Sequence, residues 1–361
     1  MASAADEGFD LVRTMLDEMR AMVEADAETE LERLEGLRAI WRIAGLTAEL
    51  NLDQDPAHPR LFSMNTAARF VGGPNPDGEY PLVMIDGRRR YRLHGTRGTS
   101  AYLGLQVLAG IGLTPRRMAA YLSDHELPVG TDGRFALVFA AIEPSAAELD
   151  GATWVPVPED ASAIVVREYL ADRATEVRAD LHVELLDDPG PVALPTEASL
   201  GEQLTSMGWT IAKLATLHKT IKPELIDQPN VLVTAGAAEL GAADTTPDNL
   251  YMLGTYRLGP EEALVLDLDP PATRYWSVTL ENIWHECLEP RRRRSSLTNA
   301  HAVAGSDGKV RVVVAAADPG AANWLDTGGR HRGWFILRWL DNPDAPAVDC
   351  RVVPRAEAGD A

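Results

Sequence analysis

The stretch that decides the fold lies between residues 275 and 340. It reads YWSVTL at 275–280, DGKVRVVV at 307–314, DPG at 318–320, NWLD at 323–326 and WFILRW at 334–339. Runs rich in β-branched and aromatic residues alternate here with Asp-Gly and Asp-Pro-Gly turns, which is typical of strands joined by tight connections. The pattern predicts a β unit whose polar residues gather in its loops.

Similar runs occur earlier in the chain, after residue 51. They read PLVMI at 81–85, RYRL at 90–93, FALVF at 135–139 and AIVVR at 163–167, and each is bounded by Pro, Gly or Asp. These runs predict a first set of strands. Between them, Thr114-Pro115 has the character of an N-cap followed by the first helical position, and it predicts a short helix up to about Leu122.

Three segments have the apolar spacing of amphipathic helices. Residues 7–26, about 29–50 and 198–222 each place apolar side chains on one face. The first two are expected to form an N-terminal helical pair. Their apolar surface must be buried within the chain or against another subunit, so we expect a homodimer through these helices.

The two strand-rich halves resemble each other. Tyr91, Asp132-Gly133, Trp154 and Arg167 recur as Tyr275, Asp307-Gly308, Trp324 and Arg338, at offsets of roughly 170 to 185 residues. Each Asp-Gly is interpreted as a hairpin turn that needs positive φ. The echo predicts two related β units, although two unrelated sandwiches would also show alternating strands and Asp-Gly turns.

Composition limits the classes of function. The chain has 361 residues, a formal net charge of −20 and 45% hydrophobic residues, which is typical of a soluble protein with room for two domains. The negative charge argues against a nucleic-acid partner. No apolar run reaches about 18 residues and no secretory signal opens the chain, so we expect no membrane partner and a cytoplasmic location. The two cysteines, Cys287 and Cys350, are expected to be free.

The second half resembles the domain-of-unknown-function 1214 family. The residues that carry the resemblance are Tyr251, Gly254, Tyr256, Ala263-Leu264, Tyr275-Trp276-Ser277-Val278, Asn299, Asp307-Gly308, Asp318-Pro319-Gly320, Asn323-Trp324-Leu325-Asp326, Gly329, Gly333 and Arg338. The first half is similar, more loosely, to family 1254. The resemblance implies an immunoglobulin-like sandwich followed by a jelly-roll-like sandwich, and it implies no chemistry. Many members continue Asn-Trp-Leu with a Pro-rich segment, whereas this chain has a polar loop at 326–331.

The fold class expected is therefore α+β, mainly β, with N-terminal and linking helices. The expected domains are an N-terminal helical pair at 1–50, a first β-sandwich at 51–190, a linking helix and loop at 191–249 and a C-terminal sandwich at 250–361.

The densest group of polar residues lies at strand ends and loops of the C-terminal unit. It comprises Glu281, Asn282, His285, Glu286, Asn299, His301, Asp318, Asn323, Asp326, His331 and Arg332. Loops at one rim of a sandwich can converge on a site. We expect His285 to transfer protons, with Asp318 or Asp326 as its orienting or second carboxylate, because a carboxylate orients an imidazole near neutrality. Glu286 is an alternative partner. For each residue the competing interpretation is a hydrogen-bonded turn residue.

The residues expected to contact the substrate come from the same loops and from neighbouring strands. They are Asn299, Asn323, Trp324, His331, Arg332, Tyr256 and Arg338. Asparagine would donate and accept hydrogen bonds, Trp324 would provide an apolar wall, and Arg338 would pair with an anion or be structural. The run Arg291 to Arg294 is either an anion clamp or a solvated turn.

Several other chemistries have no support in the sequence. There is no P-loop and no Gly-x-Ser-x-Gly elbow. No zinc-ligand spacing occurs, so we expect neither a metal nor a cofactor. We therefore expect a hydrolase or lyase that acts on a small polar or hydroxylated molecule, with carbohydrate as one candidate. A non-catalytic ligand-binding protein and a structural or assembly protein are the alternatives.

Overall fold

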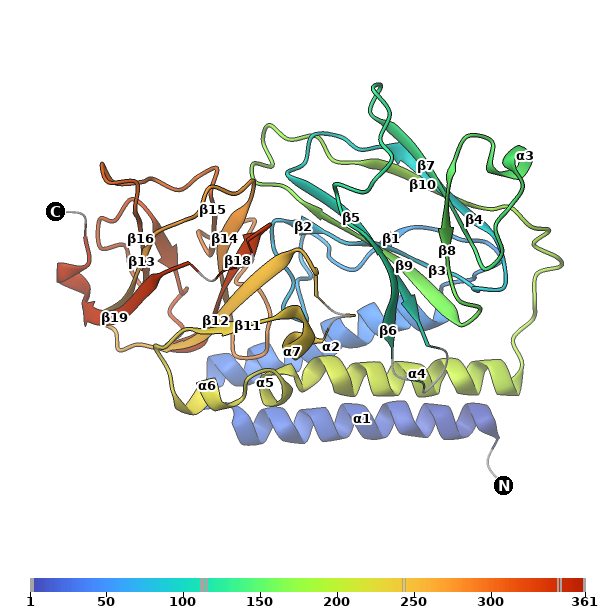
Figure 1. Cartoon of the computed structure of the whole chain (residues 1–361). Helices are drawn as coiled ribbons and strands as arrows, with labels where there is room; N and C mark the ends of the chain where they lie inside the picture. Colours follow the sequence, from blue (N-terminus) through green and yellow to red (C-terminus); the bar gives the residue numbers. More distant parts are fainter. Residues whose placement is uncertain are drawn as a thin grey trace. The chain divides into compact units, whose positions relative to one another are not determined.

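The chain divides into two compact units (Figure 1). The computed structural model describes residues 3–110, 114, 116–241, 243, 245–342, 344 and 346–359. Unit 1 comprises Met1–Ala21, Ile40–Asn65 and Gly78–Lys213, and unit 2 comprises Met22–Ala39, Thr66–Asp77 and Leu214–Ala361. These units cut across the expected domain ranges, because the two N-terminal helices and the 66–77 segment are shared out between them.

The long helices agree with the expected ones. The helices are α1 (Ala4–Asp26), α2 (Glu30–Leu52), α3 (Ala146–Leu149), α4 (Glu197–Ala215), α5 (Leu217–Thr220), α6 (Glu224–Asp227), α7 (Ala237–Leu240) and the 3-10 helix η1 (Arg355–Glu357). The segment expected as one helix at 198–222 is α4 followed by the separate α5. None of the helices in the described residues combines the length and the apolar composition that a membrane span requires.

Within unit 1, α1 and α4 run close together, as Figure 1 shows. Glycines make this approach possible, because a Cβ added to Gly201 would lie 2.6 Å from the carbonyl oxygen of Ala4. A larger side chain at that position would force the two helices apart.

Unit 1 contains two sheets. The first has the order β1-β3-β9-β5-β6, with β2 also paired to β9, and the second has the order β10-β4-β7-β8. The strands are β1 (Phe62–Ser63), β2 (Gly78–Glu79), β3 (Pro81–Met84), β4 (Tyr91–Thr96), β5 (Tyr102–Ala109), β6 (Arg117–Leu122), β7 (Arg134–Ala140), β8 (Thr153–Pro156), β9 (Ala161–Tyr169) and β10 (Asp180–Leu185).

Unit 2 also contains two sheets, with the orders β11-β12-β18-β14-β15 and β17-β16-β13-β19. The strands are β11 (Val233–Ala235), β12 (Asn249–Arg257), β13 (Glu262–Leu268), β14 (Trp276–Glu281), β15 (Ser296–Thr298), β16 (Val310–Ala315), β17 (Trp324–Asp326), β18 (Arg332–Leu340) and β19 (Val348–Pro354). The fold is mainly β with a few helices, as expected from the sequence.

The two units share one strand order. Replacing β3 to β10 by β12 to β19 converts the sheets of unit 1 into those of unit 2, and β1 corresponds to β11. Even the parallel pairs correspond, because β7 pairs with β8 and β16 pairs with β17 in parallel. The predicted repeat is therefore confirmed at the level of topology. At this level the immunoglobulin-like and jelly-roll-like types implied by the family resemblance are not distinguished.

The strand register corrects the predicted correspondence of individual residues. Arg167 pairs with Gly104 and Arg338 pairs with Ser277, so Tyr275 corresponds to Tyr102, two residues before Gly104. Tyr91 lies instead on β4, which corresponds to β13. The tryptophan match holds, because the indole Nε1 of Trp154 donates to Ala140 O at 3.0 Å and that of Trp324 donates to Ala315 O at 3.1 Å.

Two local expectations were wrong. Residues 117–122 form β6 rather than a helix, because they pair antiparallel with β5. Pro115 itself lies outside the described residues. The two Asp-Gly turns do have positive φ, 79° at Gly133 and 81° at Gly308. They are not hairpins, however, because the strands on either side belong to different sheets.

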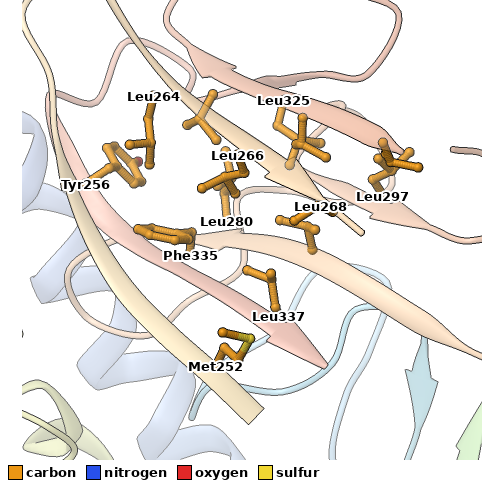
Figure 2. Packing of buried hydrophobic residues seen from close by; sticks show 14 of the residues in the cluster. Met252, Tyr256, Leu264, Leu266, Leu268, Leu280, Leu297, Leu325, Phe335 and Leu337 are labelled. Atoms are coloured by element: carbon orange, nitrogen blue, oxygen red, sulfur yellow. The ribbon is translucent and has the colours of Figure 1, made fainter. Parts of the chain in front are cut away.

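The core of unit 2 fills the space between its two sheets. Figure 2 shows side chains from β12, β13, β14, β18 and neighbouring strands packed together. Leu280, Phe335 and Leu337 contribute one face of the β14–β18 pair to this core. Because side chains alternate along a strand, residues 277, 279, 281, 334, 336 and 338 must lie on the opposite face. That opposite face carries the candidate site.

Candidate functional site

A buried imidazole–carboxylate pair lies where β14 ends. Glu281 is the last residue of β14, and its Oε2 lies 2.8 Å from Nδ1 of His285, four residues further on. The exposed fractions are 0% for Glu281 and 1% for His285. The carboxylate can only accept, so Nδ1 carries the proton and Nε2 carries the lone pair.

The backbone and the neighbours of His285 hold its ring in place. His285 has a φ of 57°, a left-handed conformation that is uncommon for residues other than glycine and asparagine. Its ring stacks on Trp334 of β18, with centroids 4.5 Å apart. Such a conformation persists only when surrounding contacts enforce it, and these residues cluster at functional sites.

Both members of the pair keep one buried polar atom without a hydrogen-bond partner. These atoms are Nε2 of His285 and Oε1 of Glu281. Buried polar groups are almost always paired, and leaving one unpaired costs about 1–3 kcal/mol. Two orphaned atoms on one hydrogen-bonded pair therefore indicate a position that is not arranged for maximal stability.

The segment 66–77, which we call the strap, covers this pair. Gly73 N donates to His285 O at 3.0 Å, and Cys287 N donates to Phe70 O at 3.2 Å. A Cβ on Gly73 would lie 3.8 Å from both Glu281 Oε2 and His285 Nδ1. Because Gly73 has a φ of 68°, a larger residue there would also strain the backbone.

Polar groups continue along the same face under the strap. The amide Nδ2 of Asn75 donates to the hydroxyl of Tyr275 at 2.7 Å, and that hydroxyl lies 3.4 Å from Asp77 Oδ2. Burial raises the pKa of Tyr275 well above its ordinary value, so the phenol remains neutral. Burial also raises the pKa of Cys287 well above its ordinary value, which argues against a thiolate nucleophile at that position.

A second imidazole–carboxylate pair lies in unit 2. Nε2 of His218 lies 3.0 Å from Asp26 Oδ2, and the ring of His218 meets Trp284 edge-on with centroids 5.0 Å apart. Burial lowers the pKa of His218, although the contact with Asp26 opposes that effect. Asp26 also binds Lys219 at 2.7 Å, so this pair is tied into a surface ion-pair group.

The expected carboxylate partners of His285 lie elsewhere. Asp318 is exposed and accepts a hydrogen bond from Gly320 N at 2.8 Å, as a turn residue does. Asp326 binds Arg293 at 2.8 Å and Gly328 N at 2.6 Å. The prediction that Asp318 or Asp326 orients His285 is therefore wrong, because Glu281 occupies that role.

Three expected substrate contacts are used by the fold itself. Asn323 is buried and bonds Val303 through both its Oδ1 and its Nδ2, at 2.8 Å each. Asn299 joins Trp276 N to Arg274 O at 3.3 and 3.1 Å. Trp324 donates to a backbone carbonyl, as described above. These contacts favour the structural interpretation of all three residues.

His331 and Arg332 belong to an ion-pair network with acidic residues that precede or begin α2. Arg332 binds both oxygens of Glu32 at 2.8 Å and reaches Glu28 at 2.7 Å. His331 Nε2 lies 3.0 Å from Glu28. Hydrogen bonding from Arg257 is the largest cause that lowers the pKa of Glu28, to about 2. The network anchors residues 330–332 and leaves these cations neutralised.

Tyr256 and Arg338 are buried on opposite faces of the sheet. Tyr256 belongs to the core in Figure 2, where burial raises the pKa of its phenol. Arg338 donates to Thr279 Oγ1 at 3.3 Å and to Gly73 O at 3.1 Å. At the corresponding position of unit 1, Arg167 donates to Gln106, the counterpart of Thr279. An arginine used in both units is a feature of the fold.

The imidazole–carboxylate pair, in contrast, has no counterpart in unit 1. By the same register, Glu281 corresponds to Leu108 and Trp334 corresponds to Ala163. The strap and Asp26 were not singled out in the sequence, because no local pattern distinguishes them. The i, i+4 spacing of Glu281 and His285 was the one available signal for this pair.

Metal ligation has no visible basis in this region. Among the described residues, no three His, Cys, Asp or Glu side chains are grouped so that they could hold a metal ion. In the run of four arginines, Arg293 pairs with Asp326, and Arg291 lies over the ring of Phe70 at 5.4 Å. These contacts favour the turn interpretation over an anion clamp.

Comparison with known proteins places this site in a conserved architecture without a named activity. Residues 244–345 match the family described as "Protein of unknown function (DUF1214)", and this range contains Glu281, His285 and Trp334. The similarity of the first half to family 1254 stays a prediction. None of the curated proteins matches the chain.

Two solved structures share the fold. The crystal structure of an uncharacterized protein from Burkholderia cenocepacia is 29% identical, with a TM-score of 0.88 over 97% of each chain. The crystal structure of a Vibrio parahaemolyticus protein is 14% identical, with a TM-score of 0.51 over 86% of this chain and 97% of that one. The second likeness concerns the fold alone.

Proposed function

We propose that unit 2 binds a small polar or hydroxylated organic molecule, with carbohydrate as the leading class, and transforms it by acid/base chemistry without a cofactor. His285 transfers the proton and Glu281 orients it. The observation that carries the proposal is the buried pair whose Nε2 and Oε1 have no partner within the fold. A ligand hydroxyl would supply the missing hydrogen bond to Nε2 and occupy the orphaned acceptor Oε1.

The geometry fits general base catalysis by the imidazole. The carboxylate of Glu281 fixes the tautomer with the proton on Nδ1 and stabilises the imidazolium that forms when Nε2 accepts a proton. Stacking on Trp334 sets the plane of the ring. Hydrolysis and elimination both need such a base, so the reaction class is that of a hydrolase or lyase.

Ligand entry requires the strap to separate from the loop beneath it, because both side chains are buried. The strap is attached there through the backbone contacts of Gly73 and Phe70 and through the bond from Arg338 to Gly73 O. Gly72 and Gly73 both have positive φ, and residues at element ends with such freedom can absorb hinge motion.

The test is a screen of p-nitrophenyl glycosides and p-nitrophenyl esters, followed by kinetics of variants on any substrate that wild type turns over. We expect His285→Gln and Glu281→Gln to lower kcat by about 100-fold or more, which is the usual contribution of a general base. Asp318→Asn is the control and should leave kcat unchanged. Unchanged catalysis in His285→Gln would remove the assigned role.

A non-catalytic ligand-binding protein is the first alternative. It uses the same orphaned atoms as hydrogen-bond partners and involves no proton transfer. In that case His285→Gln would retain ligand affinity within a few-fold, measured by calorimetry with a saccharide from the screen, and no substrate would be turned over.

An assembly role is the second alternative, favoured by exposed apolar side chains on the N-terminal helices. In unit 1, Phe9 of α1 is 65% exposed and Trp41 of α2 is 69% exposed. Large exposed aromatic groups are typical of protein contacts. If these helices form a homodimer, Trp41→Glu should halve the mass measured by light scattering, whereas Ile142→Glu, in an exposed loop, should not.

A further inference from the structure

Unit 1 has an open groove beside the edge strand β10. Its volume is about 340 Å³, and its walls are Ala57, His58, Pro59, Val183, Glu184, Leu185, Asp187 and Pro189. In the described part of the chain β10 pairs with β4 alone, so it forms one edge of its sheet. Residues 57–59 lead into β1, an edge strand of the other sheet. The groove therefore lies along the open side of the sandwich.

The backbone of β10 offers hydrogen bonds to this groove. Leu186 N donates to Arg90 O, which fixes residues 184 and 92 as a hydrogen-bonded pair two residues along. The N–H and C=O groups of Leu181, Val183 and Leu185 consequently point away from β4. A free edge of this kind can accept an added strand.

The corresponding place in unit 2 is filled. The register makes Val183 the counterpart of Cys350 and Pro59 the counterpart of Asn230. In unit 2 these two positions touch, because Cys350 Sγ lies 3.4 Å from Asn230 O. In unit 1 the groove separates them. The same fold thus closes this side in one unit with its own backbone and leaves it open in the other.

The two rows of β10 side chains indicate the chemistry of an occupant. Val183 and Leu185 face the core row and line the groove with Pro59 and Pro189. The outward row is Asp180, His182 and Glu184, with two carboxylates and no Lys or Arg. On an added strand, neighbours of the first row would be apolar and those of the second row would be basic.

We propose that this groove, together with the β10 edge, binds an extended segment of a partner protein in which apolar and basic residues alternate. The segment adds a strand to the sheet β10-β4-β7-β8. Backbone bonds to residues 181, 183 and 185 provide affinity, and Glu184 and Asp180 select for positive charge. This site lies in unit 1 and is independent of the His285–Glu281 pair.

The experiment uses the full chain and two synthetic peptides, acetyl-Lys-Val-Lys-Val-Lys-amide and its Glu-Val counterpart. Binding is followed by amide chemical shifts in deuterated, ¹⁵N-labelled protein. We expect the Lys peptide to shift amides of residues 57–59 and 181–189 and to bind about fivefold or more tightly than the Glu peptide, as favourable surface charge pairs allow. Glu184→Lys should remove that preference.

A matched pair of variants tests the backbone contribution. Leu185→Pro removes one outward N–H without breaking the bonds to β4, and Val352→Pro does the same at the corresponding position of β19. We expect only Leu185→Pro to abolish the shifts. The inference is overturned if neither peptide shifts these amides at millimolar concentration, if the Glu peptide binds as tightly, or if Leu185→Pro binds like wild type.

Discussion

Replacing the buried pair should reveal whether stability has been given up at this position. In His285→Asn the residue still tolerates a left-handed backbone, but Glu281 is left as a buried charge without its partner. Breaking a buried pair in this way costs about 3–5 kcal/mol. In the double variant Glu281→Met/His285→Asn the charge is gone, together with the orphaned Oε1 and Nε2, whose removal recovers about 1–3 kcal/mol each.

The double variant also loses the stacking of His285 on Trp334, which contributes about 0.5–1.5 kcal/mol. Its sum is therefore expected to be neutral or stabilising by about 1–4 kcal/mol, as for other buried pairs replaced by apolar groups. Hydrogen exchange of the β14 and β18 amides, followed by mass spectrometry, reports the opening free energy of unit 2 directly. A double variant as unstable as His285→Asn alone would refute the reasoning, because the pair would then be a structural element.

Three further outcomes can be checked by stability measurements. Gly73→Ala and Gly308→Ala both place Ala at positive φ and should each cost about 1–2 kcal/mol in urea unfolding, but only Gly73→Ala should alter turnover. The pKa of Glu28 is lowered to about 2 in the folded chain, so its stabilisation is present above the unfolded pKa and is lost as pH falls toward 2; Glu28→Gln should flatten the fall of Tm over that range. Arg338→Met and Arg167→Met should both destabilise their units by about 2 kcal/mol in denaturant titrations, since each removes hydrogen bonds from a buried guanidinium; a loss of turnover in Arg338→Met without a loss of stability would contradict its structural role.

Alternation and turn chemistry in the sequence were sufficient to predict most of the fold. The runs at 275–280 and 334–339 became β14 and β18 because their two-residue period matches one apolar face against the core. The repeat was visible through Trp154 and Trp324, whose indoles make the same backbone bond in each unit. Residues 117–122 were misassigned because pairing with β5 outweighed the local signal of a helix start.

The candidate site could be predicted only in part. His285 was singled out, but its partner was not, because nothing local distinguishes Glu281 from Asp318 or Asp326 in the sequence. Asn323 looked like a ligand contact because an exposed polar loop residue and a buried one that bonds backbone groups are the same letter. The strap reaches His285 from more than 200 positions away in the chain, as its bond from Asn75 to Tyr275 shows, and such contacts depend on tertiary structure.

The protonation of His285 tests the central claim most directly. In ¹⁵N-labelled protein with only this imidazole assigned, by comparison with His285→Gln, we expect Nδ1 to carry the proton in the free chain. Addition of a glycoside turned over by wild type should then shift Nε2 while Nδ1 stays protonated. A proton on Nε2 in the free chain, or ring signals that do not respond to the ligand, would contradict the assignment of this nitrogen as the base.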